Sequence, residues 1–320
     1  MPEFPVSGPI SATARISSGS LRFVAEQRDS VAVDVRPGNS GDTARQAAAE
    51  TIVEMTADGL IVETPQARGF IVRRSPSVDV TVRLPTDSQI MARTASADVT
   101  VDGRLASADV NTASGDLRIE HVAGDLRRHS ASGETQFRRV DGALNADGAS
   151  GDVRGGVVGG DLTSKSASGD VTVEAVGGSV RATSASGDFH LGNVARGQTN
   201  IHSASGDVVI GVAEGTAVWM DVSTISGDTR SELNVSDNSP TESGATLELG
   251  IRTISGDVVI RRATSAPAQP SAAQPSAAQP GTAQPSTAQP STTQPSTAQS
   301  STAQPGPAAD SAAVEDEVAD

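Results

Sequence analysis

The chain has 320 residues, with no cysteine, no tyrosine, one tryptophan, five phenylalanines and 32 glycines. Large side chains are too scarce to fill a wide core, so any interior must be thin and built from Val, Ala, Leu and Ile. The formal net charge of −15 argues against nucleic acid and anionic membrane surfaces as partners, because both bind a basic face. The lack of cysteine excludes a disulfide framework and a thiolate metal site.

The N-terminal sequence has no charged start followed by an apolar run, so it does not have the pattern of a secretory signal. No stretch of the chain approaches the roughly 18 apolar residues that a membrane span requires. We therefore expect no membrane insertion. A cytoplasmic location is favoured on this basis, with the cell surface as the alternative.

Residues 1–93 predict a strand-rich N-terminal part that packs on the following region or continues it. Apolar and polar residues alternate in four runs: RISSGSLRFVAE, SVAVDVRP, TIVEMTADGLIVET and SVDVTVRLP. Alternation interrupted by turn residues such as Asp58 and Gly59 is typical of tightly joined strands. The exception is DTARQAAAE at 42–50, where good helix formers follow Asp42 as a candidate N-cap and predict a short helix.

Residues 94–262 form a repeat with a period of 18 residues. The period is set by carboxylates that follow small turn residues: Asp98, Asp116, Glu134, Asp152, Asp170 and Asp188. The next steps lengthen to 19, 21 and 29 residues and lead to Asp207, Asp228 and Asp257. Ser stands two positions before each carboxylate, and Gly stands directly before all of them except Asp98. An apolar residue, any residue and a second apolar residue usually follow, which predicts a short strand after each turn.

Each unit also contains a weaker second half, marked by a glycine column at Gly124, Gly142, Gly160 and Gly178. Two strands this short cannot bury their inner face alone, so the units must stack. Stacking in register makes each unit one coil of a β-solenoid, with parallel strands about 4.8 Å apart and like residues on like residues. The fold class predicted is therefore an all-β, single-chain β-solenoid. Antiparallel hairpins are the alternative, but they do not explain why alternate turns differ in sequence.

The carboxylate column has two interpretations. In the structural one, each carboxylate and the Ser before it accept hydrogen bonds from backbone N–H groups of their own turn. In the functional one, the chain is a calcium-stabilised β-roll that binds Ca²⁺ along the column. The residues of this alternative are Asp98, Asp116, Glu134, Asp152, Asp170, Asp188 and Asp207. One carboxylate per coil is a poor cage for a cation that takes six to eight oxygen ligands, and the Gly-Gly-x-Gly-x-Asp signature is not matched.

No constellation of residues predicts catalysis or a cofactor. The four histidines (His121, His129, His190 and His202) fall in different columns or in coils several repeats apart. The basic cluster Arg127, Arg128, Arg138 and Arg139 is interpreted as a solvated face. Trp219, the only tryptophan, is expected to plug the open end of the core, because solenoid ends need closing. The chain is predicted not to be an enzyme and to use no cofactor.

Residues 263–320 differ in composition from the rest of the chain. Gln recurs every five residues, usually followed by Pro, among Ser, Thr and Ala. A segment without an apolar pattern cannot form a core, so we expect a disordered, extended tail that serves as a spacer or a tether.

The repeated Ser/Thr-Ala-Ser-Gly-Asp-Val units, closed by EGTAVWMDVSTISGD and IRTISGDVVIRR, resemble a bacterial β-strand-repeat domain of unknown function. That domain is often labelled "putative adhesin", and the resemblance is particularly to its actinobacterial members. It covers residues 10–263 and implies a β-solenoid with no established activity. The favoured hypothesis is a non-enzymatic adhesin or interaction scaffold with an unknown protein or surface partner. The calcium-stabilised β-roll is the alternative.

Overall fold

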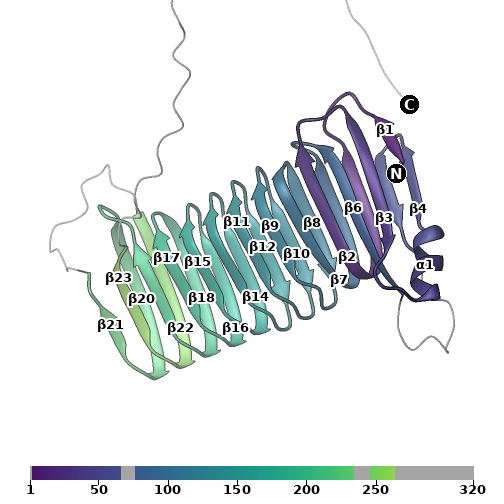
Figure 1. Cartoon of the computed structure of the whole chain (residues 1–320). Helices are drawn as coiled ribbons and strands as arrows, with labels where there is room; N and C mark the ends of the chain where they lie inside the picture. The colour runs from purple at the N-terminus through teal and green to yellow at the C-terminus, as the bar shows by residue number, and fades with distance from the viewer. Residues whose placement is uncertain (1, 66–75, 234–245, 264–320) are drawn as a thin grey trace, which may run out of the picture. The chain divides into compact units, whose positions relative to one another are not determined.

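The computed structural model describes residues 2–65, 76–233 and 246–263, which belong to one compact unit, Met1–Ala268. Hydrogen bonds connect its 23 strands into one continuous sheet, and this sheet bends twice per coil to form two faces (Figure 1). The predicted tail lies outside the described residues, apart from Ala263. None of the described helices is long and apolar enough to cross a membrane.

The repeat places its strands alternately on two faces, which we call face A and face B. Face A contains, in spatial order, β8 (Ser107–Thr112), β10 (Leu126–Ser130), β12 (Leu144–Gly148), β14 (Leu162–Ser168), β16 (Val180–Ser186), β18 (Gly197–Ser205), β22 (Thr246–Ser255) and β20 (Ala217–Ser226). Face B contains β9 (Leu117–Val122), β11 (Thr135–Val140), β13 (Val153–Val158), β15 (Val171–Val176), β17 (Phe189–Val194), β19 (Val208–Val212), β23 (Val258–Arg262) and β21 (Thr229–Ser231).

All of these repeat strands pair in parallel, and the register follows the sequence period. Leu126 lies beside Leu144, and Leu144 lies beside Leu162, each one period further along the chain. The predicted β-solenoid is therefore confirmed, and the antiparallel-hairpin alternative is wrong for the repeat. Parallel pairing follows because every coil turns twice and returns to the same face with the same chain direction.

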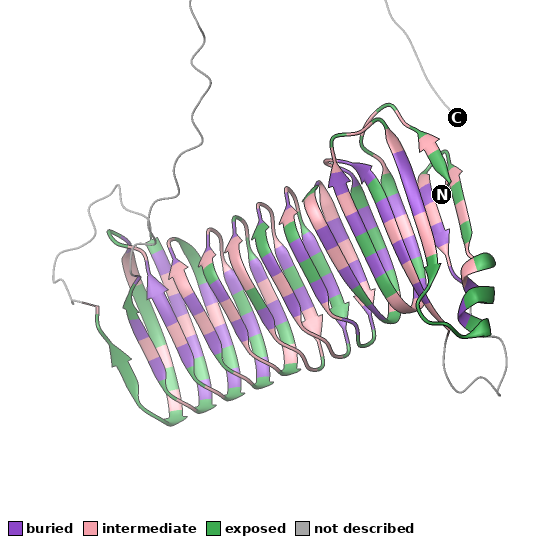
Figure 2. Cartoon of the chain, in the orientation of Figure 1, coloured by how far each residue is buried: buried purple, intermediate pink, exposed green. Residues whose placement is uncertain are grey.

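The core is the thin layer between the two faces, and alternate residues of each strand enter it. Figure 2 shows buried and exposed bands alternating along the strands, in step from coil to coil. Leu126, Leu144 and Leu162 in one column and Val122, Val140 and Val158 in another are fully buried. Each buried Leu or Val contributes roughly 1.5–3 kcal/mol of transfer free energy. In one coil Gly155 takes an inward position, and the Phe137 ring of the previous coil fills the space that a side chain there would need.

The N-terminal part joins the same stack through two long strands. β2 (Ser11–Glu26) and β7 (Gln89–Leu105) each run along face A and continue along face B, paired in parallel with each other. Beyond β2, face A continues with β5 (Gly59–Glu63) and the antiparallel β4 (Ile52–Thr56). Face B continues with β6 (Ser77–Pro85), then the antiparallel β3 (Ser30–Pro37) and β1 (Glu3–Pro5).

The predicted short helix is α1 (Asp42–Ala49), which buries Ala44 and Ala47. The predicted cap is wrong, because the N-cap residue is Gly41 and no side chain caps the helix. Asp42 lies in the first turn instead and pairs with Arg45, with 2.7 Å between Oδ1 and Nη1.

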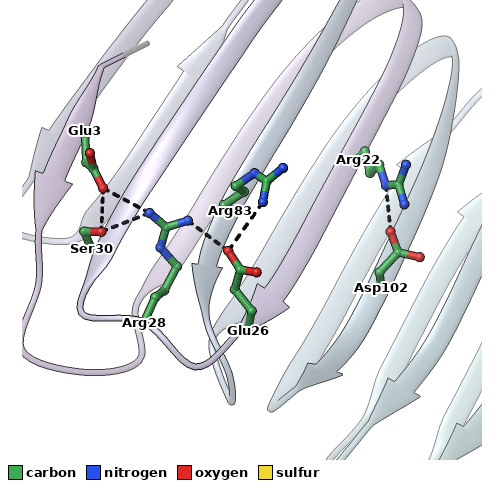
Figure 3. A network of polar contacts seen from close by, with 7 residues as sticks. All are labelled: Glu3, Arg22, Glu26, Arg28, Ser30, Arg83 and Asp102. Carbon is green, nitrogen blue, oxygen red and sulfur yellow. Dashed lines mark hydrogen bonds and ion pairs between the residues drawn. The ribbon is translucent and has the colours of Figure 1, made fainter.

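A polar network holds the connection between β2 and β3 at the N-terminal end (Figure 3). The Arg28 guanidinium donates to Glu3 and Glu26 at 3.1 Å each and to the Ser30 hydroxyl at 2.9 Å. Glu26 also lies 3.7 Å from Arg83 of β6. One largely buried arginine therefore ties β1, β2 and β3 together, which fixes the outermost strands of face B.

The order of the coils at the other end differs from their order in the sequence. β22 and β23, the last coil in the sequence, lie between the coil of β18 and β19 and the coil of β20 and β21. The outermost described coil is thus 217–231. The predicted plug is wrong, because Trp219 is 62% exposed on β20. It lies in register with Glu248, an outward position, whereas Val218 lies beside the buried Leu247.

The corner between face A and face B depends on the glycine column. Gly169 has a φ of +129°, and a Cβ there would lie 2.5 Å from the carbonyl oxygen of Gly151 in the previous coil. The same conflict recurs at Gly133, Gly151 and Gly187. Because the coils stack in register, these four corners need glycine both for the backbone conformation and for the close approach of the next coil, whereas the first corner of the repeat carries Ala97 without a positive φ.

We expect Gly169→Ala to lower the free energy of unfolding by at least about 2 kcal/mol, because it combines a left-handed φ with a backbone clash. Chemical denaturation followed by circular dichroism measures the change. Gly8→Ala is the matched control, because no atom lies within 4 Å of the added methyl group. Equal stabilities of the two variants would contradict this account of the corner.

Candidate functional site

The predicted carboxylate column lies at the corner from face A to face B, on the surface of the rod. Except for Asp228 in the outermost described coil, each aspartate of the column accepts a hydrogen bond at Oδ1 from the backbone N–H of the corresponding residue in the next coil. The distances are 2.8–3.0 Å for the donors Asp116, Glu134, Asp170, Asp188, Asp207, Asp257 and Asp228. We call this row of bonds the carboxylate ladder.

The ladder corrects the predicted hydrogen bonding of the corner. The sequence suggested that each carboxylate binds N–H groups of its own turn, but the donor belongs to the adjacent coil. The reason is the register, which places the amide of Asp188 next to the carboxylate of Asp170. The ladder follows spatial order, since Asp207 accepts from Asp257 and Asp257 accepts from Asp228. It therefore links coils rather than closing single turns.

Glu134 is the exception in the column. Its carboxylate pairs with Arg154, which also contacts Asp152 with 2.7 Å between Nη2 and Oδ2. A hydrogen bond from Gln136, followed by the one from Arg154, lowers the pKa of Glu134 below its usual value. At Glu134 an ion pair with Arg154 of the next coil, on the outer surface of face B, thus takes the place of the bond to a backbone amide.

The serine two positions before each carboxylate also acts differently from the prediction. Ser132, Ser168 and Ser205 accept hydrogen bonds through their carbonyl oxygens. The donors are hydroxyl groups two residues earlier in the chain, as in the 2.8 Å bond from Ser166 to Ser168. In these three coils the Ser-Ala-Ser sequence therefore satisfies a carbonyl oxygen at the end of the face A strand within a single coil.

The ladder leaves each aspartate one carboxylate oxygen that does not accept from the next coil. Within 2–65, 76–233 and 246–263, no group of three or more His, Cys, Asp or Glu side chains is arranged to hold a metal ion. Calcium takes six to eight oxygen ligands. Calcium binding by Asp98, Asp116, Glu134, Asp152, Asp170, Asp188 and Asp207 stays a prediction, and the geometry adds no support to it.

The histidines lie on outward positions of different strands. His129 and His202 share a column on face A but belong to β10 and β18, with three strands between them. His121 contacts Asp141 at the opposite corner, with 2.9 Å between Nε2 and Oδ2. Burial of Asp141 opposes ionisation, but hydrogen bonds from His121 and Arg139 outweigh it and lower the pKa of the carboxyl group. This contact links neighbouring coils.

The predicted solvated basic face is wrong for one of its four members. Arg127 and Arg138 are exposed, whereas Arg128 is 2% exposed and points into the core, in register with Val110 and Ala146. Its Nη2 donates to the Gly133 carbonyl oxygen at 2.6 Å. Burial lowers its pKa, and the nearby charge of Asp116 opposes that shift. Strict alternation along β10 is the signal that places Arg127 outside and Arg128 inside.

A shallow, open groove of about 730 Å³ lies on the outer surface of face A, next to the corner. One wall carries Asp147 and Lys165, which lie side by side, and Thr183 beyond them. The other wall carries the exposed alanines Ala167, Ala185 and Ala204, each the middle residue of a Ser-Ala-Ser sequence. Lys165 is the only lysine of the chain. The sequence repeats these alanines visibly, but alternation alone does not reveal that the surface is hollowed between the two columns.

We expect Asp170→Ala to lower the free energy of unfolding by about 1–2 kcal/mol, because the amide of Asp188 loses its acceptor. Asp170→Asn keeps an acceptor oxygen and should change the stability by less than about 0.5 kcal/mol. Urea denaturation of the two variants beside the parent chain measures both values. A loss as large for Asn as for Ala would mean that the charge, and not the ladder bond, stabilises the corner.

We expect the melting temperature to be the same in excess Ca²⁺ and in excess chelator, because the ladder uses amide hydrogens to hold the carboxylates in place. Differential scanning calorimetry measures the two midpoints. A ligand that binds only the folded state raises the melting temperature through mass action. A clear rise with Ca²⁺ would therefore establish the calcium-stabilised β-roll.

Comparison with known proteins places the chain in a family. The sequence profile of the family described as Toastrack DUF4097 matches residues 59–261. The chain matches no curated protein. Similar solved structures include a protein described as a "putative adhesin" from Bacteroides fragilis, with 13% identity, 81% of this chain and 95% of that chain covered, and a TM-score of 0.37. A protein with the same description from Parabacteroides merdae shows 10% identity, coverage of 81% and 94%, and a TM-score of 0.37.

The family match confirms the resemblance drawn from the repeated Ser-Ala-Ser-Gly-Asp units. The matched region begins at β5 and extends into β23, so it includes the repeat up to residue 261. It spans more than half of the chain, and the protein therefore belongs to the Toastrack DUF4097 family.

Proposed function

We propose that this chain is a non-enzymatic interaction scaffold of the adhesin type, and that the groove on face A binds a partner of extended shape. The observation that carries the proposal is the groove itself, which crosses neighbouring strands and presents the same small residue in successive coils. A partner that lies along the stack meets Ala167, Ala185 and Ala204 in turn.

The chemistry of the groove supports binding rather than catalysis. Alanine methyl groups and the hydroxyl of Thr183 suit an apolar or hydroxylated chain, while Lys165 and Asp147 can fix its polar groups. Catalysis by a general acid and base needs two titratable groups within reach of one substrate atom. His129 lies 3.6 Å from the half-buried Asp147 of the next coil, so this pair forms a contact between coils, as His121 and Asp141 do.

A printed array of glycans and peptides tests the proposal with labelled full-length chain. We expect saturable binding to a subset of extended ligands, because a preformed groove binds without reorganisation. Ala185→Arg, which fills the groove, should weaken that binding at least about tenfold. Thr172→Arg is the matched control, because it adds the same side chain to the outer surface of face B.

Two outcomes would contradict the proposal. One is that the array shows no saturable binding to any ligand. The other is that Ala185→Arg binds as tightly as the parent chain and as Thr172→Arg, which would place the contact away from the groove.

A further inference from the structure

The four outermost strands of the stack differ in how well their free edges are protected. On face B, the edge strands β1 and β21 have three residues each, and β1 carries Glu3 and Pro5. On face A, the edge strand at the N-terminal end is β4, with five residues and Glu54 at its centre. Short strands, charges and proline are the usual means of blocking edge-to-edge association.

The fourth edge strand, β20, has none of these protections. It has ten residues, no proline and one charged residue, Asp221, which lies 3.8 Å from Arg252 of β22. Among the described residues, β20 pairs with β22 alone. A long edge strand of this kind presents unpaired N–H and C=O groups to any strand that can lie beside it.

Four of the six large apolar side chains that are exposed among the described residues lie at this edge. Trp219 and Ile225 are 62% and 81% exposed on β20, and Ile254 of the adjacent β22 is 55% exposed. The inward side of β20 is apolar as well, since Val218 and Val222 are half-buried against the core and Met220 remains exposed. The core of face A therefore ends at β20 with apolar surface on the strand itself.

We infer that β20 pairs with β20 of a second copy of this chain, antiparallel and about a two-fold axis, to form an end-to-end dimer. The same edge is then used by both copies, which is the self-complementary arrangement of a two-fold interface. The inward side chains of the two β20 strands continue one core across the interface.

The structure favours this arrangement over a head-to-tail filament. A filament would need β20 to pair with the N-terminal end of another copy, where the available face A edge is the short β4 with its central glutamate. On face B the last strand, β21, places the polar Thr229 and Ser231 at inward positions, in register with the buried Val258 and Ile260. Pairing is thus favourable on face A at one end only, which limits the assembly to two copies.

Size-exclusion chromatography with light scattering tests the inference on the full-length chain. We expect a mass of twice 32.3 kDa at high concentration, falling to the mass of one chain on dilution. Because Trp219 is the only tryptophan, its fluorescence reports the interface, and the emission should move to longer wavelength over the same dilution range.

Ile225→Lys and Trp219→Lys should each weaken the dimer at least about tenfold, because either substitution places a charge at the pairing edge. Ile52→Lys is the matched control, since Ile52 is a half-exposed isoleucine on β4 at the other end, and it should dimerise like the parent chain. Circular dichroism melts check that all three variants are folded.

Three results would overturn the inference. The first is a mass of one chain at every concentration, which would mean that β20 is not a self-pairing edge. The second is a mass that grows beyond two chains with concentration, which would indicate a filament. The third is a dimer that persists unchanged in both Ile225→Lys and Trp219→Lys.

Discussion

The parallel, in-register stacking of coils is the constraint on which the rest of the structure depends. A coil of two short strands has no core of its own, so each coil is stable only when its backbone and its inward side chains meet the next one. Register fixes which residues meet, and like residues therefore face like residues along the rod. Leu126, Leu144 and Leu162 form one such column inside. The same register imposes columns of identical polar residues outside.

The outer columns place like charges close together, and the ladder offsets their repulsion. Carboxylates about 4.8 Å apart repel one another by about 1 kcal/mol per pair, even in water. The amide of Asp188 donates to the carboxylate of Asp170, and the amide of Asp170 donates to that of Asp152. Each negative group is thus compensated by an N–H dipole that stacking alone puts in place. Glycine before Asp170 lets the coils approach closely at this corner, since a Cβ at Gly169 would strike Gly151.

In a few coils, a residue differs in size from the others in its column, and a neighbouring side chain fills the difference. Gly148 and Gly155 leave spaces that the buried Arg128 and Phe137 use in the preceding coil. The two ends of the stack differ in how far their edge strands are protected from pairing with another strand. Arg28 and the antiparallel strands close the N-terminal end, whereas β20 leaves a long, apolar edge on face A.

The periodicity was sufficient to predict the solenoid, its corners and most of the N-terminal strands, because the period of two and the step of 18 are local properties of the chain. The sequence did not reveal that the donor of each ladder bond belongs to the next coil, since this depends on the distance between adjacent coils. Nor did it reveal the position of β22 between β18 and β20, because both Thr-Ile-Ser-Gly-Asp copies fit the same place equally well.

The role of Trp219 was misjudged for a related reason. Its bulk suggested a plug, but the alternation along β20 places it outward, beside Glu248. The groove lies between the column of Lys165 and the alanines of the Ser-Ala-Ser sequences, and no single residue type encodes this relation between two columns. Of the candidate site, the repeated residues were therefore predictable and their arrangement in space was not.

The central claim is that the repeated aspartates hold adjacent coils together through hydrogen bonds from the backbone of the next coil. Nuclear magnetic resonance tests it most directly, through the scalar coupling that crosses a hydrogen bond. The ladder predicts a coupling between the amide nitrogen of Asp188 and the side-chain carboxyl carbon of Asp170, with slow exchange of that amide proton. A coupling from the Asp170 carboxyl carbon to an amide of its own turn, or rapid exchange of the Asp188 amide, would contradict the account.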